Sequence, residues 1–268
     1  MTENEFKDNL IKKLKKLKIN KTKNLFITSE LSILGKTNIQ KEKLLKIILD
    51  TLKKIMGKNY SIFSPSSTMN LCNSNKIFDI KKTKSYMMGP LAEYIRGQKD
   101  SVRSIHPYWS VVCIGKNSNL LRKVSPHAYG AGSPWDIMLN LDTVQLNLGI
   151  HPSKAVSLVH HIETVVGVPY RYNKEFIHRI KSHGKIYKKK FYLSSMYLNK
   201  DIKKKKKLNQ HFFDKMKNLK LLKHEIHRCG LNMWSFKMTD FYKVSLEFFI
   251  KDIYTYLEKV PKLKKLKR

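Results

Sequence analysis

The chain has 268 residues, of which 41% are hydrophobic and 28% are charged. This composition is ordinary for a globular protein and excludes a disordered or collagen-like chain, and no stretch reaches the roughly 18–20 apolar residues of a membrane-spanning helix. The 54 basic and 20 acidic residues give a net charge of +34. The N-terminus is acidic and then basic and shows no apolar signal segment, so we expect a cytoplasmic protein.

The excess of positive charge has three interpretations. A charge of this size is typical of proteins that bind nucleic acid or attract another anionic ligand. Only seven of the 54 basic residues are Arg, the residue that binds phosphates and bases through two parallel hydrogen bonds. The lysines also gather in short runs such as Lys203 to Lys207, in a chain rich in Asn and Ile. We therefore favour a solvated lysine surface that follows compositional bias over steering of an anionic ligand, and both over nucleic-acid binding.

The first part of the chain alternates between helix and strand patterns. Apolar residues at helical spacing predict helices over residues 4–18 and 40–56, and Gly57 ends the second one. Short apolar runs predict strands at residues 25–27 and 60–63. This alternation favours an α/β sheet with crossover helices.

Helix and strand patterns continue to alternate in the middle of the chain, but not in its C-terminal part. For the middle we expect a short helix at 90–96, strands at 111–114 and 144–148, a glycine-rich turn at 130–134 and a helix at 156–166 that Gly167 ends. After residue 175 the pattern weakens. There we expect a strand at 191–198, an exposed turn at Lys203 to Lys207 and a last helix at 241–257.

The three cysteines do not indicate a disulfide framework or a zinc site. Cys72, Cys113 and Cys229 are an odd number at wide spacing. Cys113 lies in an apolar run, where a small buried hydrophobic residue is the favoured interpretation. Reduced thiols agree with a cytoplasmic location.

Several short segments follow one another in a characteristic order between residues 20 and 175. They are Ser29-Glu30-Leu31-Ser32-x-x-Gly35, Phe78-Asp79, Met88-Gly89-Pro90-Leu91-Ala92-Glu93-Tyr94-x-Arg96, Arg103-Ser104-Ile105-His106-Pro107, Gly132-Ser133-Pro134-Trp135, Leu148-Gly149, and His160-x-x-Glu163 with Gly167-Val168-Pro169-Tyr170-Arg171. In order and spacing this set resembles the aminoglycoside 3-N-acetyltransferase family, also called the antibiotic acetyltransferases. No single segment is diagnostic, but the set would rarely arise by chance.

The resemblance implies a fold and a reaction. It implies a single α/β domain over residues 1–268, with a central mixed β-sheet flanked by helices in α/β/α layers, unlike the fold of the GNAT acetyltransferases. Residues 20–175 would form the catalytic and coenzyme A-binding part, and 176–268 a divergent, lysine-rich part. The implied enzyme is an acyltransferase that moves an acetyl group from acetyl-CoA directly to an amine, without a metal.

The candidate base is a pair of residues on one helix face. Aminolysis of a thioester needs a free amine, so a base must accept a proton. His160 and Glu163 lie three residues apart on a predicted helix, and a carboxylate beside an imidazole orients it for this task. The same spacing also describes a solvated His–Glu pair with no function. A metal site at these residues and His161 is disfavoured, because no H-E-x-x-H pattern is present and His161 points about 100° away, as a spectator or core residue.

The resemblance also suggests residues that contact the thioester and coenzyme A. The hydroxyl of Ser157 takes the place of a family Thr that would stabilise the oxyanion. Ser29, Leu31, Ser32 and Gly35 follow a strand and suit phosphate or pantetheine contacts, although a turn with helix-capping serines would look the same. Arg103, Ser104 and His106 form a second candidate anion-contacting cluster, and the alternative is that His106-Pro107 only turns the chain. Gly132 to Trp135 predicts a helix start, with Ser133 as N-cap and Pro134 in the first position.

The acceptor is the least defined part of the prediction. The family implies an aminoglycoside or another amino sugar, modified at the 3-amino group, and a role in antibiotic resistance. Aminoglycosides are polycations, and a chain with a net charge of +34 repels them at long range. An amino sugar of lower charge, linked to a nucleotide or a surface polysaccharide, is therefore as well supported as a drug. The alternative from another class is a non-enzymatic nucleic-acid-binding protein.

Overall fold

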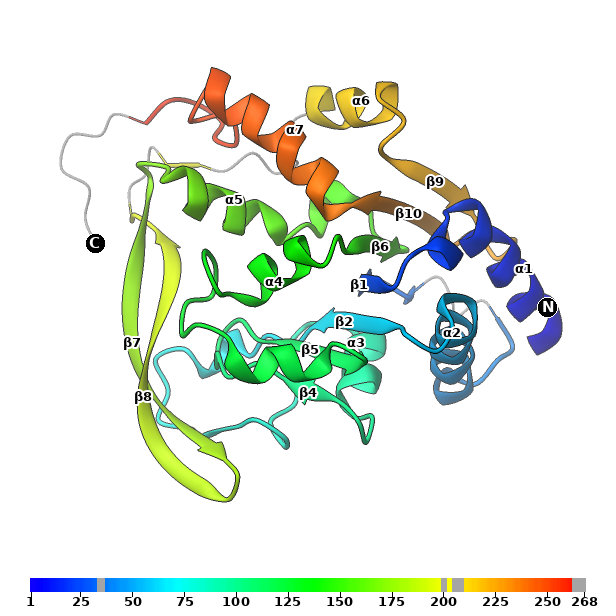
Figure 1. Ribbon diagram of the computed structural model, residues 1–268, viewed down its shortest axis with the longest axis horizontal. Coiled ribbons are helices and arrows are strands. Elements are labelled where there is room, and N and C mark those ends of the chain that lie inside the picture. The colour runs from blue at the N-terminus through cyan, green and yellow to red at the C-terminus, as the bar shows by residue number, and fades with distance from the viewer. Residues whose placement is uncertain (33–36, 199–201, 204–209, 262–268) are drawn as a thin grey trace.

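The computed structural model describes residues 1–32, 37–198, 202–203 and 210–261. Its main sheet has seven strands in the order β4-β5-β2-β1-β6-β10-β9 (Figure 1). They are β1 (Asn24–Ser29), β2 (Ser61–Pro65), β4 (Val102–Arg103), β5 (Val111–Gly115), β6 (Val144–Leu148), β9 (Lys223–Ile226) and β10 (Asn232–Lys237). β1 runs parallel to β2 and β6, whereas β4, β5, β9 and β10 join antiparallel to their neighbours. The predicted mixed sheet is confirmed.

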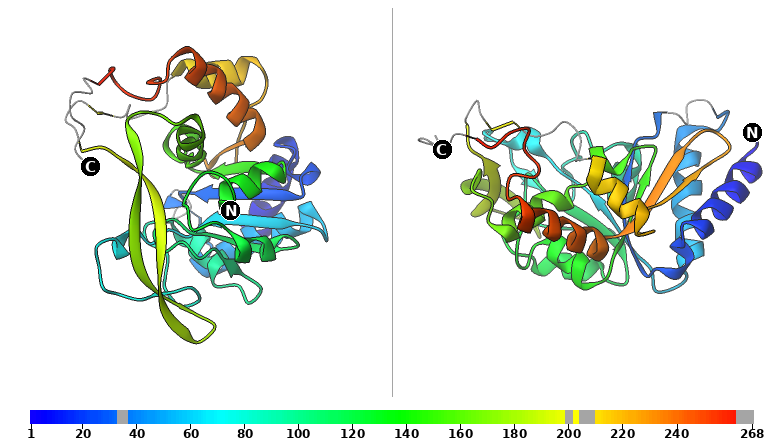
Figure 2. Two further views of the ribbon diagram at one scale, coloured as in Figure 1. Left: turned by 60° about the vertical axis from the view of Figure 1, so that its left-hand side comes forward. Right: turned by 90° about the horizontal axis from the view of Figure 1, so that it is seen from above.

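Helices cover both faces of this sheet (Figures 1 and 2). One core contains apolar residues of α1 (Glu3–Lys16), α2 (Lys41–Met56) and α3 (Pro90–Arg96); the other contains those of α4 (Pro134–Asn140), α5 (Leu158–Val166), α6 (Gln210–Asn218) and α7 (Met238–Lys251). Successive side chains of β1 point to opposite faces of the sheet, so Leu25 and Ile27 belong to the first core and Phe26 to the second. The predicted α/β/α layers are therefore confirmed.

Short 3₁₀ helices connect several of these elements, namely Ile19–Lys21, Met69–Leu71, Ser118–Lys123 and Pro152–Lys154. Three local predictions also agree with the structure. Ser133 is the N-cap of α4, where its hydroxyl accepts from the backbone N–H of Asp136. Gly167 ends α5 in the left-handed conformation, and Cys113 is fully buried. Within the described residues, no helix is both long and apolar enough to span a membrane.

A second, three-stranded sheet consists of β3 (Phe78–Asp79) and a long hairpin of β7 (Arg171–Ser182) and β8 (Lys185–Met196). Figure 1 shows the hairpin extending down one side of the molecule. His183 and Gly184 form its two-residue turn, both with positive φ, as the turns of tight hairpins require. The sequence predicted only a strand at 191–198. The rest was missed because residues 173–175 of β7 are all exposed, which removes the alternation of a half-buried strand.

The C-terminal part departs most from the predictions. α7 ends at Lys251 rather than near residue 257, because the chain turns back so that Tyr256 donates its hydroxyl hydrogen to Ser245. α6, β9 and β10 were not predicted, yet β10 pairs with β6 and extends the main sheet. Of the predicted turn at Lys203 to Lys207, residues 204–207 lie outside the described part of the chain.

Candidate active site

The parallel strands β1, β2 and β6 end side by side, and the segments that follow them approach closely. Gly149 directly follows β6, with φ of +76°, and an added Cβ would lie 1.9 Å from the carbonyl oxygen of Glu30. The backbone N–H of Glu30 in turn donates to the carbonyl of Leu148. Only glycine fits here, which explains the Leu148-Gly149 segment. Ligands commonly bind beyond the carboxyl ends of parallel strands, and two adjacent hollows lie at this edge.

The outer hollow is a groove of about 920 Å³. Three residues predicted to contact the cofactor, Ser29, Leu31 and Ser32, line it, whereas Gly35 lies outside the described residues. Its other lining residues include Thr37 and Lys41 at the N-terminus of α2, and Gly89 and Pro90 at the start of α3. The groove therefore combines hydroxyl groups, one lysine and a helix N-terminus, which are suited to a phosphorylated ligand.

The inner hollow is a pocket of about 240 Å³. It shares Ser29, Met87 and Ile150 with the groove, and its lining extends to Ser157 directly before α5. Two of its other lining residues carry a buried polar atom that has no hydrogen-bond partner among the described residues, Thr28 Oγ1 and Trp135 Nε1. The two hollows are thus adjacent, and together their linings extend from the strand ends to the start of α5.

The Arg103-Ser104-x-His106 segment lies behind one wall of the inner pocket. That wall consists of Trp109, Ser110 and Val111. The Nε–H of Arg103 donates to Ser110 Oγ at 2.9 Å, and Ser104 Oγ accepts from the backbone N–H of Val111 at 2.9 Å. His106 Nδ1 accepts from the backbone N–H of Trp109 at 3.1 Å. Each of the three side chains therefore holds one residue of the wall.

At this pocket, these contacts give the cluster a use other than the predicted contact with the cofactor. Besides Ser110, the guanidinium of Arg103 donates to the backbone carbonyls of Thr83 and Ser66. Burial lowers the pKa of His106 to about 4, so its imidazole is neutral at pH 7. Its Nε2–H then donates to the carbonyl of Tyr192, 3.2 Å away. We accordingly treat Arg103, Ser104 and His106 as positioning residues of the pocket wall.

His160 and Glu163 form the predicted pair on α5. His160 Nδ1 lies 2.8 Å from Glu163 Oε2, and the His160 side chain is 29% exposed while Glu163 is fully buried. Glu163 also forms an ion pair with Arg171, whose Nε lies 2.9 Å from the same oxygen. Nδ1 also lies 3.1 Å from Arg171 Nη2, a group that can only donate. The contact with the carboxylate is shorter, and an ionised carboxylate can only accept, so we assign the imidazole proton to Nδ1, directed at Glu163. Nε2 then keeps its lone pair and can accept a proton.

Tyr170 and Arg171 complete this cluster, and their roles were not predicted from the sequence. The Tyr170 hydroxyl donates to Glu163 Oε1 at 3.1 Å, and Arg171 Nη1 donates to the carbonyl of Ser194 at 2.7 Å. Burial, followed by the nearby charge of Glu163, raises the pKa of Tyr170 well above its usual value, so the phenol stays protonated as a donor. A Tyr-Arg pair in the quoted Gly-Val-Pro-Tyr-Arg segment, in a chain with few arginines, was the signal available in the sequence.

The inner pocket and the histidine are neighbours through α5. The backbone N–H of His160 donates to the carbonyl of Ser157, so this pocket residue lies one helical turn before His160. Aromatic rings connect them on the other side, because Trp109 packs against Tyr129 and Tyr129 contacts His160 edge to face at 5.6 Å.

The remaining histidine of this helix is a core residue, as the sequence suggested. His161 is 2% exposed, and its Nδ1 accepts from the backbone N–H of Gly130. Burial lowers the pKa of His161 to about 4. In the part of the chain that the structure describes, no three or more His, Cys, Asp or Glu side chains are grouped so as to hold a metal ion.

Solved structures share this fold. AAC(3)-Xa, an aminoglycoside acetyltransferase, matches with a TM-score of 0.76 and 16% identity over 91% of this chain and 92% of that one. AAC-IIIb in a binary complex with CoASH matches with a TM-score of 0.74 and 14% identity, over 95% and 98%. AAC-VIa with bound sisomicin matches with a TM-score of 0.73 and 16% identity, over 91% and 97%. A comparison with curated protein sequences gives no match.

The sequence itself matches a family model. The model describes aminoglycoside 3-N-acetyltransferases and covers residues 26–247, so the match includes the strands of the main sheet from β2 to β10, both hollows and the His160–Glu163 pair. It also extends well beyond residue 175, where the predicted resemblance stopped. The non-enzymatic alternative is therefore wrong, and the chain belongs to the aminoglycoside 3-N-acetyltransferase family, as an acyltransferase.

Proposed function

We propose that the protein transfers the acetyl group of acetyl-CoA to an amine of an amino sugar, with His160 as general base. The observation that carries this proposal is a pair of adjacent hollows with three lining residues in common, which extend from the outer groove at Ser29 to the inner pocket at Ser157, one helical turn before His160. Together they would form a path along which a long, narrow donor enters at one end and presents its reactive end to a base at the other. The neighbour AAC-IIIb, solved with CoASH, has the same fold.

The residues along the path suit coenzyme A. Its phosphates would lie in the outer groove, near Lys41 and the N-terminus of α2, where the helix dipole favours negative charge. Its pantetheine arm carries amide carbonyls, which are acceptors for the unpartnered Trp135 Nε1–H and Thr28 hydroxyl of the inner pocket. When bound, the thioester supplies an activated acetyl carbon.

The side chains at the end of the path divide the chemical work. His160 Nε2 accepts a proton from the amine as the new N–C bond forms, and later returns a proton to the leaving thiolate as the C–S bond breaks. Glu163 holds the imidazole through Nδ1 and stabilises the imidazolium. The Ser157 hydroxyl lines the pocket and would donate a hydrogen bond to the thioester oxygen when negative charge develops on it.

The acceptor we propose is an amino sugar, with the 3-amino group as the acetylated position that the family name describes. Sisomicin is bound by the neighbour AAC-VIa, so aminoglycosides belong to the acceptors to be tested. In this chain, however, the carboxylate beside the base is fully buried and already paired with Arg171. It offers no free negative charge to a polycation. This favours an amino sugar of lower charge, such as one linked to a nucleotide or a polysaccharide.

The proposed site for the acyl donor is tested by filling the space between the two hollows with a larger side chain. Ile150 lines both hollows where they meet, so Ile150→Trp would fill the junction, while Ile150→Leu keeps the volume. We expect the Trp variant to bind coenzyme A at least about tenfold more weakly in calorimetry, and the Leu variant to bind within about threefold of wild type. Unchanged affinity in a folded Trp variant would contradict the path.

The acceptor is tested by comparing amines of different charge. Thiol release from acetyl-CoA is measured with an aminoglycoside and with a neutral-to-anionic amino sugar, at two salt concentrations. We expect the less charged acceptor to have the higher kcat/KM at low salt, and the difference to shrink as salt screens repulsion. A higher kcat/KM for the aminoglycoside at low salt would restore the drug as the better candidate.

A further inference from the structure

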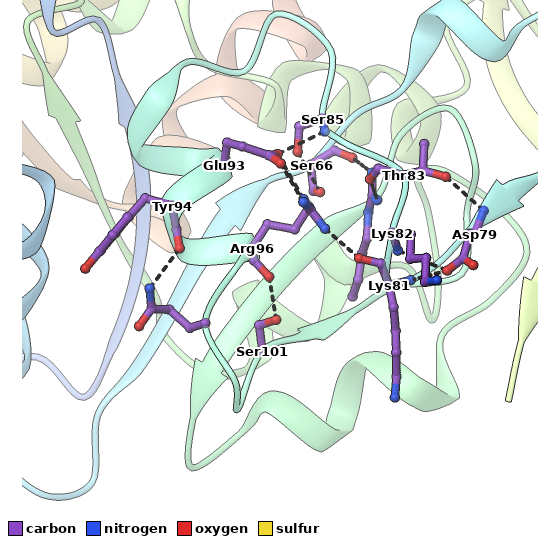
Figure 3. A network of polar contacts seen from close by, with 12 residues as sticks. Ser66, Asp79, Lys81, Lys82, Thr83, Ser85, Glu93, Tyr94, Arg96 and Ser101 are labelled. Atoms are coloured by element: carbon purple, nitrogen blue, oxygen red, sulfur yellow. Dashed lines mark hydrogen bonds and ion pairs between the residues drawn. The ribbon is translucent and has the colours of Figure 1, made fainter. Parts of the chain in front are cut away.

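A third hollow, of about 590 Å³, lies at the opposite end of α3 from the donor groove. Pro90 at the start of α3 lines the groove, and Arg96 at its end lines this hollow. Four other segments contribute to it, from the loop after β3, β4, the 3₁₀ helix Ser118–Lys123 and the tip of the β7–β8 hairpin. Figure 3 shows lining residues from the first of these segments and from α3, namely Asp79, Lys81, Lys82 and Arg96.

The lining of this hollow is strongly cationic. Seven Lys and Arg side chains line it against a single carboxylate, that of Asp79. Asp79 already accepts from the backbone N–H groups of Lys81 and Lys82, both at 3.0 Å. The seven cations are Lys81, Lys82, Arg96, Lys99, Arg103, Arg122 and Lys181. A concave site with this excess of charge concentrates anions from solution.

Compositional bias accounts for lysines on the surface but not for this selection. The whole chain has only seven arginines, and three of them, Arg96, Arg103 and Arg122, line this one hollow. Arginine is the residue whose planar fork matches phosphate oxygens. Arginine is therefore enriched in this hollow, and a solvated lysine surface that follows compositional bias does not explain that enrichment.

One of these arginines is buried without a carboxylate partner. Arg103 is 6% exposed, and its contacts are the hydroxyl of Ser110 and the backbone carbonyls of Thr83 and Ser66. Within the described residues, the neighbouring Glu93 is paired with Arg96, and no carboxylate is paired with Arg103. Burial, and after it the charge of Arg96, lowers the pKa of Arg103 to about 9. A buried guanidinium without a carboxylate partner lowers the stability of the folded protein, and a bound anion would offset that cost.

We propose that this hollow binds a compact ligand carrying two or more phosphate groups, at a site separate from the acyl-donor groove. Its volume lies in the range of small-ligand sites. A single monovalent anion would leave most of the excess charge unmatched, whereas a di- or triphosphate group spans several of the converging side chains. Free polyphosphates and nucleoside polyphosphates share this chemistry.

The experiment uses the full chain and inorganic tripolyphosphate as the probe, with calorimetry at constant ionic strength. Lys99 and Lys181 line the hollow from two different segments, and we replace both in Lys99→Gln/Lys181→Gln. The matched control, Lys12→Gln/Lys54→Gln, removes the same charge from exposed positions of α1 and α2. We expect the first pair to weaken tripolyphosphate binding at least about tenfold, and the control to change it less than about twofold.

Two further measurements identify the site and the source of the phosphates. Saturating coenzyme A should leave tripolyphosphate bound, because the two sites are separate, and the first variant should keep the wild-type affinity for coenzyme A. Adenosine triphosphate that binds more tightly than tripolyphosphate assigns the ligand to nucleotides, and equal affinity assigns it to polyphosphates in general.

The proposal is overturned if both double variants weaken the probe equally, since binding then follows total charge alone. It is also overturned if coenzyme A displaces the probe, or if inorganic sulfate binds as tightly as tripolyphosphate. None of these outcomes affects the reaction proposed for His160, which is measured separately by thiol release.

Discussion

The two histidines of the quoted segments, His160 and His106, have opposite surroundings. His160 is partly exposed and contacts the carboxylate of Glu163 through Nδ1. His106 is buried, and both of its ring nitrogens contact backbone groups, of Tyr108 and Trp109 on one side and Tyr192 on the other. Both lie in short polar segments that looked functional in the sequence. We therefore propose His160 as the base and His106 as a positioning residue from the burial and the hydrogen-bond partners of each ring, and not from the motif around it.

This contrast has a physical cause. A buried imidazole between backbone donors and acceptors is held neutral in one tautomer, because protonation would place a second donor against the N–H groups it accepts from. An imidazole beside a carboxylate can gain a proton without losing a partner. Only the second arrangement can cycle between the two states during a reaction. The following predictions test the contrast, from the largest expected effect to the smallest.

His160→Ala should cause the largest loss of activity. We expect turnover per folded molecule to fall by ~10²–10⁴, the usual contribution of a positioned base, with the melting temperature and coenzyme A affinity nearly unchanged. His106→Ala should behave in the reverse manner, with a clearly lower melting temperature. A His160 variant that loses stability yet retains wild-type turnover once folded would assign the pair a structural role.

Glu163→Gln should have a smaller effect on activity than His160→Ala. The amide keeps the shape but removes the charge that stabilises the imidazolium, so we expect turnover to fall by about 10–100-fold. It should also lower stability, because Arg171 then becomes a buried charge without its partner. Single-turnover rates and thermal melts of the same preparation separate the two effects. Wild-type turnover in this variant would remove Glu163 from the mechanism.

Acid should destabilise the protein through its buried histidines. For His106 the folded pKa is about 4 and the unfolded value about 6.5, so between these values the unfolded chain binds a proton that the folded chain does not. Stability is then complete above pH 6.5 and is lost as the pH falls towards 4, by up to about 3 kcal/mol for this group. Denaturant titrations at pH 8 and pH 5 measure the loss. We expect a smaller difference between the two in His106→Gln, and an equal difference would contradict the neutral, buried imidazole.

Ser157→Ala should have the smallest effect of the series. Loss of one hydrogen bond to a developing oxyanion is expected to reduce kcat by less than about tenfold here, since neighbouring backbone groups can compensate in part. Ser157→Thr keeps the hydroxyl and should retain most of the activity, which distinguishes a donor from a space-filling residue. Equal kcat values for the Ala and Thr variants would exclude the hydroxyl from catalysis.

Features that depend on residues close together in the sequence were predictable, and features that depend on residues far apart in the sequence were not. The layers, α2 and the His160–Glu163 contact were predictable, because amphipathic spacing and a separation of three residues act within one helix. The roles of Arg103 and His106 were not, since their partners Ser66, Thr83 and Tyr192 are distant in sequence. Much of the hairpin was also hidden, because its exposed runs at residues 173–175 and 185–188 show no alternation of buried and exposed positions.

The central claim, that His160 Nε2 accepts the proton of the attacking amine, is tested most directly by chemical rescue. Thiol release by His160→Ala is measured as imidazole is added, with His106→Ala in parallel. We predict that the rate of the His160 variant rises in proportion to the concentration of neutral imidazole and that the His106 variant does not respond. A His160 variant that is inactive at every imidazole concentration while binding coenzyme A normally, or one that is fully active without imidazole, would contradict the account.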